Sequence, residues 1–160
     1  YVSSGLEDLV VLKTSDSEFT GFIRDEYTTL PDATDRIMAT QVSAKWRHDS
    51  HDFSAIKKKD FGKSFTQASE TMVAVFADHY SLSLQQTLFE MGKETITQQP
   101  EISAVRLSLP NRHHFLVDLS PFGLENDNEV YFAADRPYGL IEAVVTRDDA
   151  SDAGFTWPAW

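Results

Sequence analysis

The stretch MATQVSAKW, residues 38–46, decides the fold class because its apolar and polar residues alternate without a break. One parity class holds the mostly apolar set Met38, Thr40, Val42, Ala44 and Trp46, and the other holds Ala39, Gln41, Ser43 and Lys45. Successive residues of a strand point to opposite faces of a sheet. The stretch therefore predicts a half-buried β-strand.

Upstream, the apolar run 9–12 predicts a strand over residues 6–14. The segment between the two strands, residues 19–35, contains Gly21, Pro31 and many charges without a sustained period. It is typical of a long structured insertion, and loops of this length are usually functional.

Downstream, two helices are expected before the pattern returns to β-structure. Apolar residues at spacings of three or four predict a helix over residues 53–79. A second helix begins at Ser83, where Gln86 completes a capping-box pattern, and Pro100 ends it. Alternation then resumes over residues 102–119, interrupted by Pro110, which indicates an edge position or a bulge.

Short β-like runs follow at residues 130–133 and 140–146. The order strand, strand, helix, helix, strand, strand favours an α+β layer, with an antiparallel four-stranded sheet and both helices on one face. We expect one domain over residues 1–150 and a polar C-terminal tail over 151–160.

Composition excludes several classes of partner. The 14 basic and 25 acidic residues give a formal net charge of −11, which repels nucleic acid and anionic membrane surfaces. There is no cysteine, hence no disulfide or zinc-thiolate site, and no apolar run approaches the roughly 20 residues of a membrane span. Without a signal-peptide layout or a C-terminal Ser-Lys-Leu address, the sequence favours a bacterial cytoplasm over a peroxisome.

Familiar catalytic signatures are missing, including a phosphate-binding glycine loop, a nucleophile elbow and a His-Glu-x-x-His motif. His48 and His51 have metal-ligand spacing, but they lie where the alternation fades into a charged segment, so we interpret them as surface-loop residues and expect no metal. The lysines 57–59 are interpreted as the solvated start of a helix.

Asn111 and His113 share the parity of an otherwise apolar strand face. Either nearby backbone groups satisfy the hydrogen bonds of both side chains, or the two side chains form a polar cluster in a pocket where His113 moves protons.

Each of three further side chains has two possible roles. Arg36 suits a planar anion, or it pairs with Asp32 or Asp35. Gln85 lies in a helix first turn that favours anions, or it only caps the helix. Phe19 is a stacking plate or a core anchor.

Several of these positions lie in segments that match a known family. In order and with compatible gaps, five segments resemble the uricase (urate oxidase) family: EFTGFIRDEYTTLPDATDRIMAT, VSAKWR, SLSLQQTLFEMG, SLPNRHHFLVDL and DRPYGLIEAVV. The resemblance spans nearly the whole chain. It implies that the chain is the second, C-terminal domain of two tandem tunnelling-fold (T-fold) domains. It further implies a homotetramer whose active sites lie at subunit interfaces, and inactivity without the N-terminal domain.

The resemblance also implies residue roles. Phe19 would stack on the purine, Arg36 and Gln85 would hold it from opposite sides, the backbone N–H of Leu84 would add a helix-terminus contact, and Leu30 would form an apolar wall. Asn111 would lie at the position of dioxygen and water, and His113 would belong to a proton relay.

The implied reaction is oxidation of urate by O2 and water to 5-hydroxyisourate and H2O2, without metal or organic cofactor. The relay lysine and threonine of the family, and an aspartate beside them, belong to the first domain, and the adjacent Lys13 and Thr14 do not match them. Two alternatives stay open. One is a non-catalytic T-fold assembly or binding module, and the other is a T-fold enzyme acting on pterins, several of which use zinc.

Overall fold

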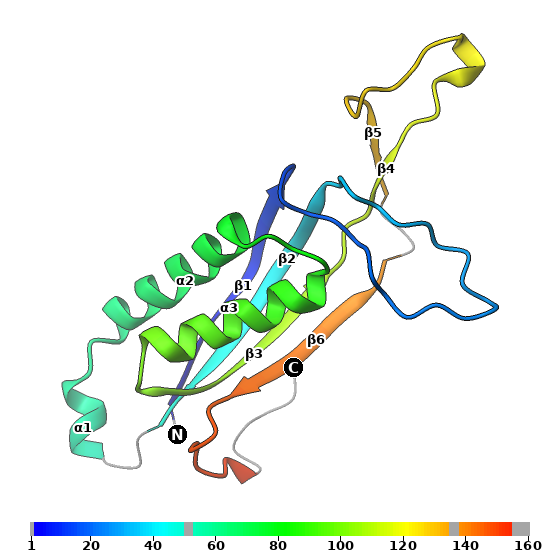
Figure 1. Ribbon diagram of the computed structural model, residues 1–160. Helices are drawn as coiled ribbons and strands as arrows, with labels where there is room; N and C mark the ends of the chain where they lie inside the picture. The colour runs from blue at the N-terminus through cyan, green and yellow to red at the C-terminus, as the bar shows by residue number, and fades with distance from the viewer. Residues whose placement is uncertain (1, 50–52, 135–137, 155–160) are drawn as a thin grey trace.

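The computed structural model describes residues 2–49, 53–134 and 138–154. Four strands form one antiparallel sheet, and they are β1 (Val2–Lys13), β2 (Met38–His48), β3 (Ile102–Pro110) and β6 (Leu140–Thr146). Their order in the sheet is β1-β2-β3-β6 (Figure 1). The sheet bears out the predicted α+β architecture.

Two long helices, α2 (Phe61–Asp78) and α3 (Leu84–Gln98), lie side by side on one face of the sheet (Figure 1). The core forms between them and the inner parity class of β2, where Val42, Ala44 and Trp46 have no exposed surface. The apolar face predicted for residues 38–46 is thereby confirmed.

The single helix predicted over residues 53–79 is wrong, because the structure has a short α1 (Phe53–Lys58) and a separate α2. The break has a local cause. The backbone N–H of Lys59 donates to the Ile56 carbonyl and ends α1, and the Asp60 carboxylate then accepts from the N–H of Lys63 at 2.9 Å. An acidic N-cap starts a new helix because it satisfies an otherwise free donor.

The predicted strand over residues 102–119 also ends early. β3 stops at Pro110, which has no N–H to continue a ladder. The chain then forms a second ribbon, in which β4 (His114–Leu116) pairs with β5 (Tyr131–Ala133), linked through the 3-10 helix η1 (Ser120–Phe122). This ribbon, residues 114–133, projects from the body, and we call it the arm (Figure 1).

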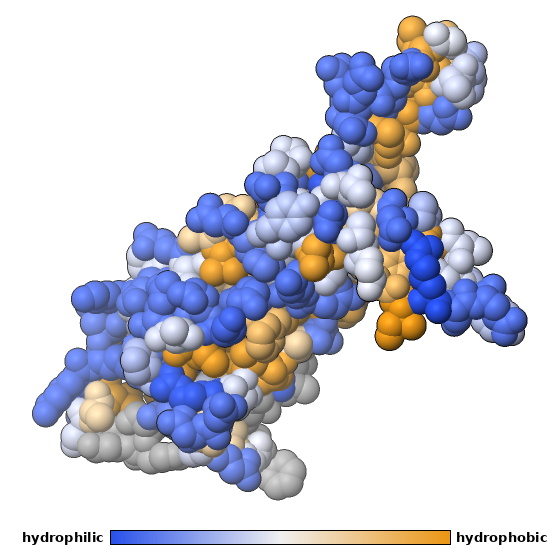
Figure 2. Space-filling view, viewed as in Figure 1, coloured by the Kyte–Doolittle hydropathy of each residue, from blue (hydrophilic) through white to orange (hydrophobic). Residues whose placement is uncertain are grey.

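The arm leaves large apolar side chains uncovered, as the space-filling view shows (Figure 2). The exposed set is Phe115, Leu116, Phe122, Leu124, Val130 and Phe132. An isolated two-stranded ribbon is marginally stable, and exposed apolar patches mark interaction sites. The arm therefore has the character of a contact surface.

A β-bulge interrupts β1 near its middle. Leu6 pairs with Ala44 and Leu9 with Val42, so Glu7 and Asp8 together face one residue of β2. Asp8 adopts a left-handed φ of 60°, and its carboxylate accepts from the Gln41 amide at 2.6 Å.

The segment after β6 is tied to the body. The Arg147 guanidinium donates to the carbonyls of Ile96 and Ile102, each at 2.9 Å, and the Ser151 hydroxyl donates to Asp49 at 2.7 Å. The predicted tail lies outside the described residues from residue 155 onward. No helix in the described ranges is long and apolar enough to cross a membrane.

Candidate functional site

The predicted site residues gather at one end of the sheet, where β1 and β3 finish and β2 and β6 start. We call it the site end. Backbone contacts join its segments, since the N–H of Arg36 donates to the Ser17 carbonyl at 3.1 Å and the N–H of Glu18 donates to the Ser81 carbonyl at 2.8 Å. Residue 81 lies just before α3, so this bridge brings the helix N-terminus toward Arg36.

Arg36 is the most unusual side chain of the site end. Its Nε and Nη2 atoms are buried and have no hydrogen-bond partner among the described residues. Burial lowers the pKa of its guanidinium. Buried polar groups in proteins are almost always hydrogen-bonded. A half-buried cation with two unused donors is therefore prepared for an acceptor that the described chain does not supply.

The alternative role for Arg36, an ion pair with Asp32 or Asp35, does not occur. Asp32 is engaged by Arg24 instead, with Nη2 of Arg24 2.8 Å from its carboxylate. Asp35 accepts from the Asn128 amide at 3.4 Å.

Phe19 lies beside this guanidinium, with the Arg36 Cζ 5.5 Å from the centroid of its ring. Reciprocal backbone bonds to Ala33 hold Phe19 in place, at 2.7 Å and 3.0 Å. The ring stacks on Phe22 at a centroid distance of 4.7 Å and an interplanar angle of 13°. Phe19 is half-buried and packs within the insertion rather than in the main core. The position suits a stacking plate better than a core anchor.

Asn111 and His113 reach the site end by a route that the sequence did not indicate. Both follow the end of β3, so they do not share one continuous strand as predicted. Asn111 forms an isolated bridge with Thr40, and its N–H donates to the Gly139 carbonyl at 2.8 Å. The His113 carbonyl accepts from the N–H of Ala134 at 2.9 Å.

The His113 ring is half-buried and lies within the electrostatic influence of Arg36. Burial lowers the pKa of His113, and the positive charge of Arg36 lowers it further. The neutral imidazole is thus the favoured form near pH 7, and a neutral imidazole can accept a proton. The structure thus brings Phe19 and Arg36 into contact, and the charge of Arg36 acts on His113.

Gln85, Leu84 and Leu30 are less closely joined to this group. Gln85 is exposed in the first turn of α3, and within the described chain it makes no hydrogen bond to Arg36. The Leu84 side chain is 1% exposed and belongs to the core, which leaves its backbone N–H as the group that could face a ligand. Leu30 is 51% exposed, and its carbonyl accepts from Arg24 at 3.2 Å.

The predicted capping pattern at α3 is present in a modified form. The N–H of Gln86 donates to the Ser83 hydroxyl at 3.1 Å, whereas the Gln86 side chain accepts from the N–H of Leu82 at 3.0 Å. Leu84 and Gln85 therefore occupy the first turn as predicted, where free N–H groups favour anions.

Several polar groups of the site end were not predicted. Ser17 and Thr40 are buried, and their hydroxyl oxygens have no partner within the described ranges. Lys13, 8% exposed, donates to the His79 carbonyl, and its pKa is lowered mainly by burial, with the charge of Arg36 adding to the effect. No spacing pattern in the sequence marks these residues. Thr40, for example, occupies an inward position of β2 in the same way as its apolar neighbours.

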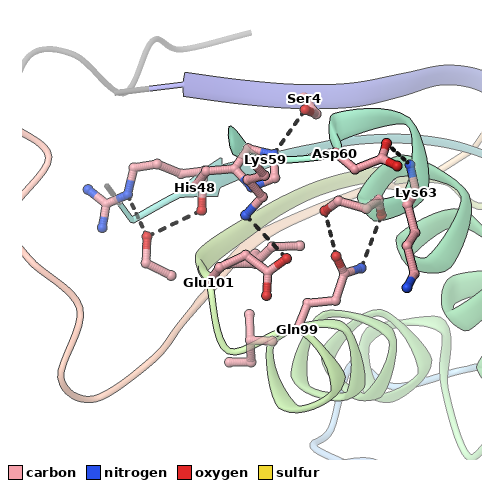
Figure 3. Close-up of polar contacts among 12 residues, drawn as sticks. Ser4, His48, Lys59, Asp60, Lys63, Gln99 and Glu101 are labelled. Atoms are coloured by element: carbon pink, nitrogen blue, oxygen red, sulfur yellow. Dashed lines mark hydrogen bonds and ion pairs between the residues drawn. The ribbon is translucent and has the colours of Figure 1, made fainter. Parts of the chain in front are cut away.

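A second polar cluster lies at the opposite end of the sheet (Figure 3). His48 ends β2 and is 1% exposed, so its assignment to a surface loop is wrong. Its ring lies 3.0 Å from the Ser4 hydroxyl through Nε2 and meets Phe61 edge-on. Nearby, Lys59 and Glu101 form an ion pair at 3.2 Å.

Strand β2 stays paired with β3 as far as residue 48. His48 has the same parity as Ala44 and Trp46, so its side chain points to the inner face of the sheet and is buried. Its predicted neighbour His51 lies outside the described residues. Nowhere in the described chain do three His, Asp or Glu side chains approach closely enough to hold a metal ion.

Comparison with known proteins identifies relatives of the chain. The family model described as Uricase matches residues 2–142. Uricases of Arthrobacter globiformis and Oryctolagus cuniculus are 51% and 41% identical to the chain, over 92% and 91% of its length. The chain covers 47% and 49% of those two proteins, so it spans about half the length of the curated relatives it matches.

Solved structures give the same result. The crystal structure of the Arthrobacter globiformis uricase superposes with a TM-score of 0.89 at 49% identity, over 97% of this chain and 52% of that one. A uricase structure from Bacillus fastidious, at 25% identity, superposes with a TM-score of 0.74 over 99% of this chain and 50% of that one.

The antiparallel four-stranded sheet with two helices on one face defines an α+β module of the T-fold class. More particularly, the chain belongs to the uricase family.

Proposed function

We propose that this chain is the C-terminal half of a urate oxidase and supplies part of an active site that an N-terminal T-fold domain completes. The observation that carries the proposal is the buried Arg36 guanidinium, which has two donors without partners beside the ring of Phe19. A planar anion such as urate can stack on the ring and accept from a guanidinium. The relatives that match the chain are named uricases.

The proposed reaction removes two electrons from urate and passes them to O2. Urate, O2 and water give 5-hydroxyisourate and H2O2, with the oxygen of water added to the ring. The substrate anion is itself electron-rich, so the protein must orient it, stabilise charge and move protons. In this scheme Arg36 and Gln85 hold the purine and Phe19 stacks on it. Leu84 contributes a backbone N–H and Leu30 an apolar wall.

Two groups are assigned to the chemical step. Asn111 is placed at the O2 and water position, and His113 is placed in the proton relay. The depressed pKa of His113 supports this role, because a relay that starts from neutral imidazole can take up a proton near pH 7. The lysine and threonine that complete the relay are assigned to the N-terminal domain.

The proposed assembly is a homotetramer with active sites at subunit interfaces. Its support is the uncovered apolar surface of the arm and the half-length match to the relatives. A bacterial cytoplasm suits a chain without cysteine.

The test is reconstitution. The chain is co-expressed with the segment of the Arthrobacter globiformis uricase that it does not match, and urate absorbance and H2O2 are followed in the same sample. We expect stoichiometric loss of urate and release of peroxide. His113→Ala should lower kcat more than it raises KM, because a relay acts on the chemical step.

A correctly assembled complex that binds urate without oxidising it would contradict the proposal and indicate a binding module. Metal that copurifies in stoichiometric amount and is required for turnover of a pterin would indicate the third candidate class.

A further inference from the structure

The ring of Phe22 is the strongest feature of the site end that the proposed function does not use. Its parallel contact with Phe19, at 4.7 Å and 13°, covers one face of the Phe19 ring. A flat ligand that stacks on Phe19 cannot use that face, and it would lie next to the Arg36 guanidinium, whose Cζ is 5.5 Å from the ring centroid. Because Phe22 belongs to the same insertion, this contact does not depend on a partner chain.

Arg24 supports Phe22 in turn. The Arg24 Cζ lies 4.5 Å from the centroid of the Phe22 ring. Two anchors fix the guanidinium, the Asp32 carboxylate at 2.8 Å and the Leu30 carbonyl at 3.2 Å. The contacts thus run in sequence from Arg36 to Phe19, Phe22 and Arg24.

The insertion that carries this series is built from its own hydrogen bonds. Asp25 accepts from the N–H of Tyr27 at 3.0 Å and from the Thr28 hydroxyl at 2.9 Å. The bridge between Phe19 and Ala33 closes its base. A phenyl ring on a loop rotates unless packing holds it, and small errors in substrate placement are costly in catalysis. The loop is therefore built to hold the plane of one ring.

We propose that Phe22, supported by Arg24, is a positioning residue that fixes the plane of Phe19 for a flat purine substrate. This inference rests on the proposed function. Phe22 acts through Phe19 and takes no part in the chemistry itself.

The experiment uses the reconstituted enzyme with Phe22→Ala, Phe22→Leu and Phe22→Tyr. Ile23→Ala is the matched control, because Ile23 is 97% exposed on the same loop. For each protein, KM and kcat for urate, the Kd of xanthine as a flat purine probe, and the melting temperature are measured. Phe22→Leu keeps the apolar bulk but has no planar ring, whereas Phe22→Tyr keeps the planar ring.

We expect Phe22→Ala and Phe22→Leu to lower kcat/KM roughly tenfold, the upper range of an aromatic pair, mostly through a higher KM. The Kd of xanthine should rise in parallel. Phe22→Tyr should stay within about twofold of the parent, as should Ile23→Ala, and Arg24→Ala should show a smaller loss than Phe22→Ala.

Parent-like KM in Phe22→Ala or Phe22→Leu would overturn the inference. Equal loss in all three variants, including Tyr, together with a lower melting temperature would also overturn it, by showing a structural role. Absence of urate turnover in the parent complex would instead count against the proposed function, so the two failures are distinguishable.

Discussion

The guanidinium of Arg36 lies over the ring of Phe19, 5.5 Å from its centroid, and keeps two buried nitrogens without a hydrogen-bond partner in the described chain. Buried donors without partners lower the stability of a fold, and here they would favour a bound anion. Both effects can be measured.

Arg36→Ala should lower kcat/KM for urate by a factor that corresponds to about 2–4 kcal/mol, because the variant loses a charged double donor to the substrate. Arg36→Lys should recover only part of this loss, since an ammonium group cannot present the same planar fork. Steady-state kinetics of the reconstituted enzyme provide the measurement. Unchanged kinetics in both variants would remove Arg36 from the site.

Arg36→Met should leave the free energy of unfolding unchanged or raise it by about 1 kcal/mol, because it removes unsatisfied buried donors and keeps an apolar stem. Arg47→Met is the matched control. Arg47 is 3% exposed and donates to the Ser103 hydroxyl at 2.9 Å and the Ser151 carbonyl at 2.7 Å. That variant should lose about 1–3 kcal/mol in urea unfolding. Equal losses in the two variants would contradict this account.

His113 should titrate below the ordinary histidine value, because burial and the charge of Arg36 both lower its pKa. In Arg36→Gln the charge is gone and the burial stays, so the His113 pKa should move upward while remaining below the ordinary value. Ring-proton NMR as a function of pH checks this shift. A His113 titration that does not respond to Arg36→Gln would mean that the two side chains do not interact.

His48 should make the fold sensitive to mild acid. Burial, with help from the charge of Lys59, lowers its pKa from 6.5 to about 4. The unfolded chain therefore binds a proton before the folded one does. Stability from this group is complete above pH 6.5 and is lost as pH falls toward 4, by up to about 3 kcal/mol.

His48→Gln should flatten that part of the stability profile relative to the parent, as urea unfolding between pH 4 and 7 would show. His114→Gln, at a half-buried position in the arm, serves as the control. The same slope in the parent and His48→Gln would assign the acid sensitivity to other groups.

Gly92→Ala should destabilise the fold by about 1–3 kcal/mol through overpacking. A Cβ at Gly92 would lie 2.7 Å from Cγ2 and 2.9 Å from Cβ of Val145, where α3 packs on β6. Gly62→Ala is the matched helical control, because its nearest neighbour is the Asp60 carboxylate at 3.4 Å, and it should be neutral or slightly stabilising. Thermal unfolding separates the two, and equal stability would contradict the close approach.

The sheet and the helices could be predicted because their signals are local. Alternation over residues 38–46 marks the inner face of β2, and the Ser83 pattern marks the start of α3. The break at Asp60 was missed because the apolar spacing that followed it was strong enough to obscure a cap. Pro110 was recognised as an interruption, but the separate ribbon after it was missed because the arm repeats the alternation without being part of the main sheet.

The site was predicted from family resemblance more than from pattern. The sequence around Arg36 or Phe19 does not show which residues these side chains contact. Those contacts depend on how the insertion folds back over the end of the sheet. Ser17, Thr40 and the burial of His48 were missed for the same reason, since only tertiary packing decides whether such side chains find partners.

The bulge in β1 has a consequence for assembly. In the described part of the chain β1 is an edge of the sheet, so an added strand would meet an irregular ladder at Glu7 and Asp8. A strand displaced by one residue would also turn its side chains to the wrong faces. The bulge therefore limits which strands could pair with this edge, because an added strand would need a matching irregularity in its ladder.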